Sequence, residues 1–146
     1  MDKFDGLKLE NQLCFPLYAA AREVIKQYHP FLEAVDLTYT QYIVMMVLWS
    51  ERKISVRDLC KKLYLDSGTL TPVLKSMEGK GLLRRYRSAE DERVLIVELS
   101  DAGDALREKA VEIPPQIGAC IRLEPQEALT LYQLLYKVLQ GMQDEG

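Results

Sequence analysis

Residues 55–81 contain the pattern that most restricts the fold of this chain: two short helix signals separated by a tight polar turn. Ser55 can cap a helix that runs to about Tyr64, because its hydroxyl can accept a hydrogen bond from a free backbone N–H of the first turn. Asp66 or Ser67 can cap a second helix, which two glycines bring to an end. Two helices of about ten residues joined in this way are typical of a helix-turn-helix motif.

Strand signals follow the second helix. The segments LLRRYRS and RVLIVELS flank AEDE and are rich in β-forming residues, which predicts a hairpin. A short extended segment, KIS, precedes the motif. We therefore predict a mainly α fold with a small β-hairpin wing, that is, a winged helix-turn-helix.

A further helix signal precedes the motif in the segment TYTQYIVMMVLWS. Thr38 and Gln41 have the spacing of a capping box, in which two side chains satisfy each other's backbone N–H groups. The run that follows, 42–49, is hydrophobic nearly all round. This helix is therefore expected at the centre of the core.

The two ends of the chain also carry helix signals. An amphipathic pattern covers roughly 7–28, and Pro30 disfavours its continuation. A capped helix is expected over about 101–113, where Pro114–Pro115 must break or sharply bend it. A last helix is expected over about 125–140.

The terminal helices have apolar faces that are most easily buried against a second copy of the chain. We therefore expect a homodimer formed through these helices. The whole chain, 1–146, is interpreted as a single domain, with about 1–35 and 101–146 for dimerisation and about 36–100 for the winged helix-turn-helix.

Composition places the chain among globular proteins, since 48% of its residues are hydrophobic and 28% are charged. The segment MDKFDGLKLE is too polar for a signal peptide, and no apolar run approaches the ~20 residues of a membrane span. These features predict a cytoplasmic protein without membrane contact.

Charge is distributed unevenly along the chain. The part from Arg52 to Arg93 holds 11 Lys and Arg against 6 Asp and Glu, a net charge of +5, whereas the remainder holds 8 against 16, a net charge of −8. A basic middle between acidic ends is expected when one face of a protein meets phosphate. Ordinary variation in surface charge is the alternative.

The second helix of the motif and the hairpin carry the residues that we expect to contact double-stranded DNA. The N-terminal part of a helix can meet base edges and phosphates in the major groove, and arginine is favoured at a narrow groove. A solvated helix and a charged hairpin are the alternative. The candidates are Ser67, Thr69, Thr71 and Lys75 on the helix and Arg84, Arg85, Arg87 and Arg93 on the hairpin.

The cysteines Cys14, Cys60 and Cys120 are widely spaced and odd in number, and His29 is the only histidine. A structural zinc site needs four ligands, usually in close pairs, so we expect no metal and no cofactor. The cysteines are then either inert core residues or redox-active thiols. Cys60, within the motif, is interpreted as structural.

Four segments carry a resemblance to a known family: LCFPLYAAAREVIKQYHPFL, LTYTQYIVMMVLW, LYLDSGTLTPVLKSMEGKGLLRR and RSAEDERVLIVELSDAG. With its helix-turn-helix and its Asp91-x-Arg93 wing, the chain resembles the MarR family of winged-helix regulators. The LCFxLY segment and two tyrosine motifs make it most similar to the organic-hydroperoxide-sensing branch, the OhrR repressors. The resemblance implies a homodimer on pseudo-palindromic operator DNA, with Arg93 in the minor groove.

The resemblance also assigns roles around a reactive thiol. Cys14 matches the peroxidatic cysteine, Tyr28 and Tyr39 match tyrosines that hydrogen-bond its sulfur, and Tyr18 sits beside them. In a two-cysteine subgroup, a cysteine in the region of Cys120 resolves the sulfenic acid as an intersubunit disulfide. The other route is a mixed disulfide between Cys14 and a small cellular thiol.

Helix geometry limits which tyrosines can reach the thiol. Tyr18 follows Cys14 by four residues, so both lie on one helix face. Tyr28 follows by fourteen residues, about 21 Å along a straight helix, and must reach Cys14 from the partner subunit or across a bend. Pro16 lies at a position where the family more commonly has a small residue. The resemblance therefore does not define the path of the helix around Cys14.

These observations favour a repressor that is not an enzyme, senses organic hydroperoxides through oxidation of Cys14, and releases its operator through an intersubunit disulfide with Cys120. The alternative is a MarR-type repressor released by a noncovalent small aromatic ligand. A thiol peroxidase that uses Cys14 is a third reading.

Overall fold

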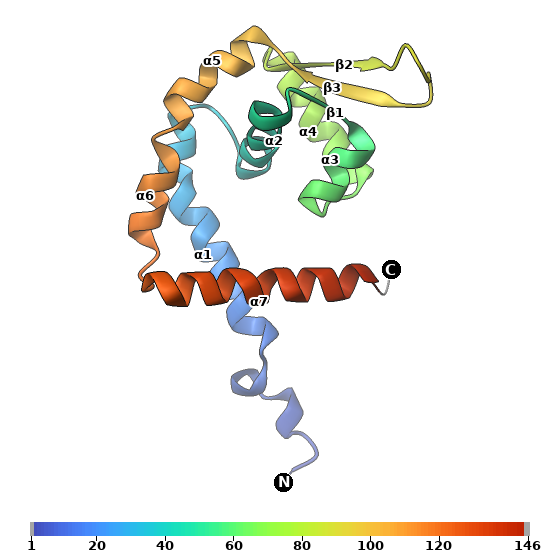
Figure 1. Ribbon diagram of the computed structural model, residues 1–146. Helices are drawn as coiled ribbons and strands as arrows, with labels where there is room; N and C mark the ends of the chain where they lie inside the picture. Colours follow the sequence, from blue (N-terminus) through green and yellow to red (C-terminus); the bar gives the residue numbers. More distant parts are fainter. Residues whose placement is uncertain (1, 145–146) are drawn as a thin grey trace. The chain divides into compact units, whose positions relative to one another are not determined.

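The computed structural model describes residues 2–144, and the chain divides into two compact units, Met1–Pro114 and Pro115–Gly146 (Figure 1). Seven α-helices and one three-stranded sheet are present in the described residues, which confirms the predicted fold class. The assignment of 1–146 to a single domain stays a prediction. The elements are η1 (Asp5–Leu7), η2 (Leu9–Asn11), α1 (Cys14–Glu33), α2 (Tyr39–Glu51), β1 (Lys53–Ser55), α3 (Val56–Leu63), α4 (Ser67–Gly79), β2 (Leu83–Arg87), β3 (Leu95–Leu99), α5 (Asp101–Ala110), α6 (Ile113–Cys120) and α7 (Pro125–Asp144).

Four helices begin at a side chain that accepts a hydrogen bond from the backbone N–H three residues later. These bonds satisfy N–H groups that have no acceptor within the helix, and they confirm the predicted helix starts. At α2 the bond is reciprocal, as the capping-box spacing predicts. The acceptors are Thr38, Ser55, Asp66 and Ser100, at donor–acceptor distances of 3.1, 3.1, 2.7 and 3.0 Å.

The bounds of α1 differ from the prediction at both ends. The helix predicted over 7–28 begins only at Cys14, after two short 3-10 turns, and it continues past Pro30 by three residues. Pro30 removes one hydrogen bond without ending the helix, because the burial of Leu32 in the last turn stabilises that turn. Pro16 lies in the first turn, where a missing N–H leaves no acceptor unsatisfied, so it fits the helix.

The helix bounds around Pro114–Pro115 and at the end of the last helix also differ from the prediction. The helix predicted over 101–113 already ends at Ala110, and Pro114–Pro115 lie in the first turn of α6, where proline is favoured. Pro72 is the sixth residue of α4, which continues through it. The last helix runs four residues beyond its predicted end.

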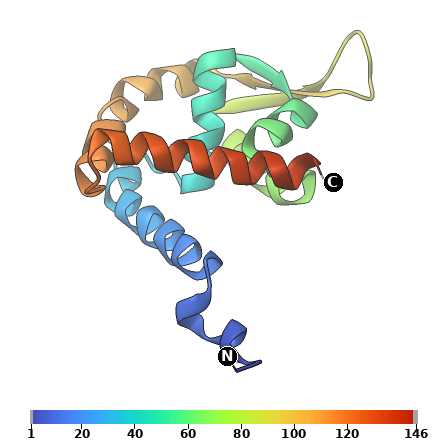
Figure 2. The same cartoon turned by 60° about the horizontal axis from the view of Figure 1, so that its bottom comes forward.

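The sheet has the order β1-β3-β2 and is antiparallel throughout. Val97 at its centre pairs with Ile54 on one side and with Arg85 on the other. The two-stranded hairpin that we predicted is therefore the outer part of a three-stranded sheet. The β2–β3 connection extends away from α3 and α4 as a wing (Figures 1 and 2).

The core of the first unit is built around α2, as its all-round apolar sequence predicts. This helix contacts α1, α3, α4, α5, β1 and β3. Its own Val44, Met45 and Leu48 are fully buried, together with Leu59, Leu70, Leu74, Met77 and Val97 of other elements.

The second unit consists of most of α6 and the long helix α7. Several apolar side chains of α7 are exposed in the single chain, for example Leu131, Leu134 and Met142. The rings of Tyr132 and Tyr136 lie 4.8 Å apart on this helix. Among the described helices, none combines the length and apolarity that crossing a membrane requires.

Candidate DNA-binding surface and redox residues

The candidate recognition helix α4 presents its predicted residues to solvent. Ser67, Thr69, Thr71 and Lys75 are all exposed. The Asp66 carboxylate accepts the Thr69 N–H at 2.7 Å, which holds the pKa of Asp66 below its usual range. The Thr71 hydroxyl donates to the Ser67 carbonyl at 2.7 Å. The N-terminal turn of α4 is thus well anchored and carries small polar groups outward.

A groove of about 1330 Å³ opens between α3, α4 and the wing. Ser67 and Thr71 of α4 line it together with Asp91 and Arg93 of the wing, so residues of two separate elements meet at one surface. This arrangement brings together two of the elements that we predicted to contact DNA. Arginine and hydroxyl donors along one groove suit phosphate and base edges.

Two cations of α3 also line the groove and were not among the sequence candidates. Arg57 and Lys61 are four residues apart, so they lie on the same face of α3, and both are exposed. The pair could have been found in the segment VRDLCKKL, where cations recur at helical spacing in the first helix of the motif.

At the tip of the wing, Asp91 holds Arg93 in a fork. The Arg93 Nε and backbone N–H donate to Asp91 Oδ1 at 3.1 and 3.0 Å, and a terminal guanidinium nitrogen donates to Oδ2 at 3.2 Å. These bonds lower the pKa of Asp91. The Arg93 side chain is nevertheless 90% exposed. Asp91 therefore orients a cation that is open to a ligand.

Two of the other wing arginines are engaged within the chain. Arg84 pairs with Glu98 across the sheet and lies over the ring of Tyr86. Arg85 donates through its backbone N–H and its guanidinium to Glu78 at 2.9 and 3.2 Å, which ties the wing to α4. Their role in DNA contact stays a prediction, as does that of Arg87, which is exposed on β2.

The cysteines occupy three different environments. Cys14 is exposed at the first residue of α1. Cys120 is exposed at the last residue of α6, and its thiol donates to the Gln116 carbonyl at 3.4 Å. Cys60 is half-buried in α3, where burial, and then the nearby Asp66 carboxylate, raise the pKa of its thiol. A thiol held protonated in this way is a poor nucleophile.

Two of the three predicted tyrosines meet in the first unit. The rings of Tyr28 on α1 and Tyr39 on α2 lie 4.9 Å apart. Tyr42, which was not a sequence candidate, joins them at 5.7 Å from Tyr28. Burial, followed by the neighbouring Tyr39 and Tyr42, raises the pKa of Tyr28 to about 12. Its hydroxyl is therefore a stable hydrogen-bond donor at neutral pH.

Tyr18 lies apart from this cluster. This residue is 58% exposed on α1, and the Arg22 guanidinium lies over one face of its ring, 5.5 Å from the ring centre. The structure therefore groups the candidate thiolate-stabilising residues into a half-buried pair and a single exposed ring.

Comparison with known proteins places this geometry in a family. A family model described as "Transcriptional regulator SarA/Rot" matches residues 26–110. The organic hydroperoxide resistance transcriptional regulator of Bacillus subtilis is 45% identical over 145 residues, which cover 99% of each chain.

Solved structures show the same relationship. AbfR, from Staphylococcus epidermidis, is 33% identical in its overoxidised, DNA-bound form, with a TM-score of 0.79 over 97% of this chain and 99% of that one. It has also been solved in a reduced form bound to DNA and in a disulfide form. A point mutant of MarR from E. coli, complexed with operator DNA, is 25% identical with a TM-score of 0.81 over 95% of this chain and 99% of that one.

The family match covers more than half of the chain, and the Bacillus relative extends over almost all of it. The helix-turn-helix, the basic groove and the Asp91–Arg93 wing supply the matching DNA-binding architecture. The chain belongs to the MarR-type winged-helix transcriptional regulators, with SarA/Rot and OhrR-like members as its relatives.

Proposed function

We propose that the chain is a homodimeric repressor that binds a pseudo-palindromic operator, senses organic hydroperoxides through Cys14 and releases the DNA when this thiol is oxidised. One observation carries the proposal: Cys14, in the LCFPLY segment, is exposed in the first turn of α1 in a chain so similar to an organic hydroperoxide resistance regulator. The reduced, overoxidised and disulfide structures of AbfR support cysteine redox chemistry within this family.

The DNA contacts follow from the groove and the wing. Ser67, Thr69, Thr71 and Lys75 of α4 are taken to enter the major groove. Arg93, oriented by Asp91, is taken to enter the adjacent minor groove, where the negative potential favours arginine. Arg57 and Lys61 add phosphate contacts from α3. Arg84 and Arg85 contribute mainly by holding the wing in place through Glu98 and Glu78.

The path of α1 favours an intersubunit sensor. Cys14 and Tyr28 lie on one helix and are fourteen positions apart, which corresponds to about 21 Å. The Tyr28 hydroxyl of the same chain is therefore out of reach of the sulfur. We infer that Tyr28 and Tyr39 of the partner subunit approach Cys14, with Tyr18 of its own helix beside it.

The proposed chemistry proceeds in two steps, oxidation of Cys14 and formation of a disulfide. The Cys14 thiolate attacks one peroxide oxygen, so that an S–O bond forms, the O–O bond breaks and an alcohol leaves after protonation, with the sulfur as sulfenic acid. The Cys120 thiolate of the partner subunit then attacks that sulfur, which forms an S–S bond and releases water. A bond between helices of two subunits would move the two recognition helices away from their one-turn spacing on the operator.

The test measures operator affinity before and after treatment with cumene hydroperoxide. The wild type is expected to lose affinity, the Cys14→Ser variant to keep it, and the Cys60→Ser control to respond like the wild type. Release of Cys14→Ser to the same extent as the wild type would disprove the proposal.

Mass spectrometry under non-reducing conditions separates the two resolution routes. A cross-linked peptide of Cys14 and Cys120 from a covalent dimer supports the disulfide route. A small-thiol adduct on Cys14 supports the mixed-disulfide route instead.

A noncovalent ligand is the second candidate trigger, and one cavity favours it. A hollow of about 180 Å³ between α2 and α5 is lined by Tyr42, Met46, Trp49 and Arg107, among others. Its size, aromatic walls and single cation suit a small aromatic acid. Release of the operator by salicylate from the Cys14→Ser variant, together with indifference of the wild type to peroxide, would select this trigger.

A further inference from the structure

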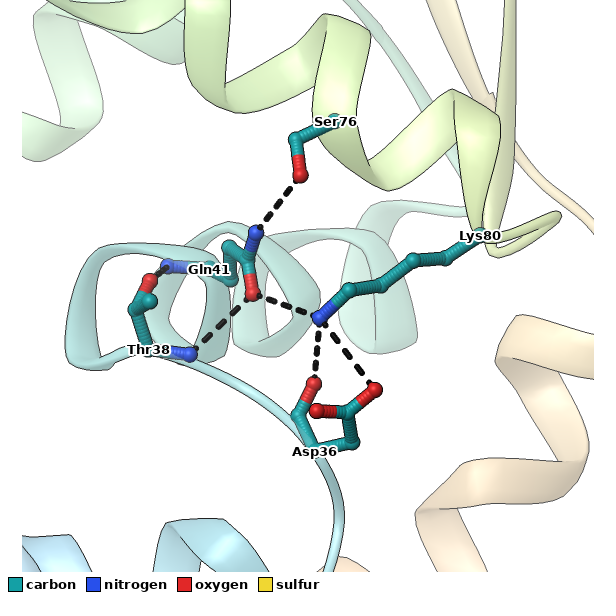
Figure 3. A network of polar contacts seen from close by, with 5 residues as sticks. All are labelled: Asp36, Thr38, Gln41, Ser76 and Lys80. Carbon is teal, nitrogen blue, oxygen red and sulfur yellow. Dashed lines mark hydrogen bonds and ion pairs between the residues drawn. The ribbon is translucent and has the colours of Figure 1, made fainter.

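A polar network joins the corner between α1 and α2 to the C-terminal end of α4 (Figure 3). The Lys80 ammonium donates to the Asp36 carbonyl at 2.5 Å and to Gln41 Oε1 at 3.2 Å, and it lies 3.6 Å from Asp36 Oδ2. Gln41 Nε2 donates to the Ser76 hydroxyl at 3.3 Å. One side chain of α2 therefore holds Ser76 and Lys80, which are one turn apart at the end of the recognition helix.

Gln41 uses both ends of its amide in this network. It is 6% exposed, and it is the one polar side chain that is buried in the part of the chain that the structure describes. Its Oε1 accepts the Thr38 N–H at 3.1 Å as well as the Lys80 ammonium. An amide supplies an acceptor and donors at once, so its loss would leave groups on both α2 and α4 without their partner.

The same turn of α2 carries the tyrosine cluster. Tyr39 is the first residue of α2, two residues before Gln41, and its ring lies 4.9 Å from that of Tyr28. Asp36 has a left-handed backbone with φ of 53°, which gives the corner a defined conformation. Because Tyr39 and Gln41 lie in the same helical turn, a displacement of Tyr39 also moves Gln41.

We propose that Gln41 is a positioning residue, which couples the Tyr28–Tyr39 pair to the orientation of α4 and thereby to operator affinity. Helix α4 is continuous over its 13 residues. A shift of its C-terminal end therefore tilts its N-terminal end, where Ser67 and Thr71 line the groove. The inference rests on the proposed function in one respect, since it takes the tyrosines as the place where oxidation of Cys14 is felt.

The first experiment compares the ratio of operator Kd in peroxide-treated and reduced protein. Gln41→Met keeps the length of the side chain and removes its hydrogen bonds, and we expect this ratio to fall about tenfold. Gln41→Glu can still accept from Thr38, Lys80 and the Ser76 hydroxyl, and we expect it to keep the ratio within about twofold of the wild type. A wild-type ratio in Gln41→Met, or an equal loss in both variants, would overturn the proposal.

The second experiment needs no peroxide. In the reduced protein, Tyr39→Leu and Lys80→Met are combined in a double-mutant cycle on operator Kd. Tyr39 belongs to the tyrosine pair and Lys80 follows the C-terminal end of α4, which are the two parts that the proposal couples. We expect the change in operator Kd of the double variant to differ about fivefold from the product of the changes in the two single variants. The matched control is the same cycle with Lys109→Met, on the exposed face of α5, in place of Lys80→Met. In this control cycle the effects of the two substitutions on operator Kd should be independent.

The two experiments distinguish this inference from the proposed function. If wild-type protein keeps its operator after peroxide, the sensor proposal fails, and the cycle still decides whether the tyrosines and α4 are coupled. If wild-type protein releases the operator while the Tyr39 and Lys80 effects are independent, the sensor stands and the role of Gln41 is refuted. If Gln41→Met does not fold, the cycle is repeated with Ser76→Ala in place of Lys80→Met, because among the described residues the Ser76 hydroxyl contacts the network only through Gln41 Nε2.

Discussion

Replacing Gly103 with alanine would test how closely α5 packs against the corner between α4 and β2. Gly103 is buried in the first turn of α5, and a Cβ there would lie 2.2 Å from the Leu82 carbonyl oxygen and 2.8 Å from Leu99 Cδ1. Non-bonded heavy atoms are at their optimum near about 3.5 Å. The start of α5 would therefore have to move outward by about 1 Å.

That movement strains three hydrogen bonds around the helix start. Ser100 donates through its N–H to the Leu82 carbonyl at 3.1 Å and through its hydroxyl to the Gly81 carbonyl at 2.6 Å, while Trp49 Nε1 donates to the Gly103 carbonyl at 2.9 Å. Each such bond contributes about 1 kcal/mol. The higher helix propensity of alanine offsets about 1 kcal/mol. We expect the free energy of unfolding to fall by about 2 kcal/mol, in the usual range for overpacking.

Urea denaturation followed by circular dichroism measures this change. With a slope of about 2 kcal/mol per M, the midpoint should fall by about 1 M. All variants must be compared at one protein concentration, because the stability of the proposed dimer would depend on it. Gly79→Ala is the control, since no atom beyond its chain neighbours and the backbone of its own helix lies within 4 Å of the Cβ position, and it should not destabilise the protein. A Gly103→Ala protein within about 0.5 kcal/mol of wild type would refute the reasoning.

Two further predictions concern the wing and the tyrosine cluster. Arg93→Ala should weaken operator binding by about tenfold or more and reduce the slope of log K against log salt concentration by about one unit. Asp91→Ala removes the group that orients Arg93 and should cause a smaller loss of affinity. Equal losses of affinity in the two variants would contradict the orienting role. The pKa of Tyr28 is raised from 10.0 to about 12 in the folded chain, so stability is retained below pH 10 and lost as the pH rises towards 12. A shift of this size corresponds to about 2.7 kcal/mol, which the half-exposed ring reduces to about 1 kcal/mol. Alkaline unfolding of Tyr28→Phe, monitored by tyrosinate absorbance and circular dichroism, should begin at higher pH, and an unchanged midpoint would count against this assignment.

Helix starts were predictable from the sequence because a cap is a local interaction. Ser55, Asp66 and Ser100 each bond a backbone N–H only three residues away, so no knowledge of the rest of the fold is needed. The uninterrupted apolar run of α2 likewise identified the central helix. The wing was predicted from its β-forming segments, which β2 and β3 confirm. The redox role of Cys14 comes from the LCFPLY segment and stays a prediction.

Tertiary structure decided whatever depends on contacts between distant residues. The pairing of β1 with β3, the continuation of α1 past Pro30 and the meeting of Tyr28 with Tyr39 all follow from packing that no local pattern encodes. The same is true of Arg85, a candidate DNA contact in the sequence that turns to Glu78 in the structure. Hydrogen bonds and burial depend on which surfaces meet, and the sequence determines that only through the complete fold.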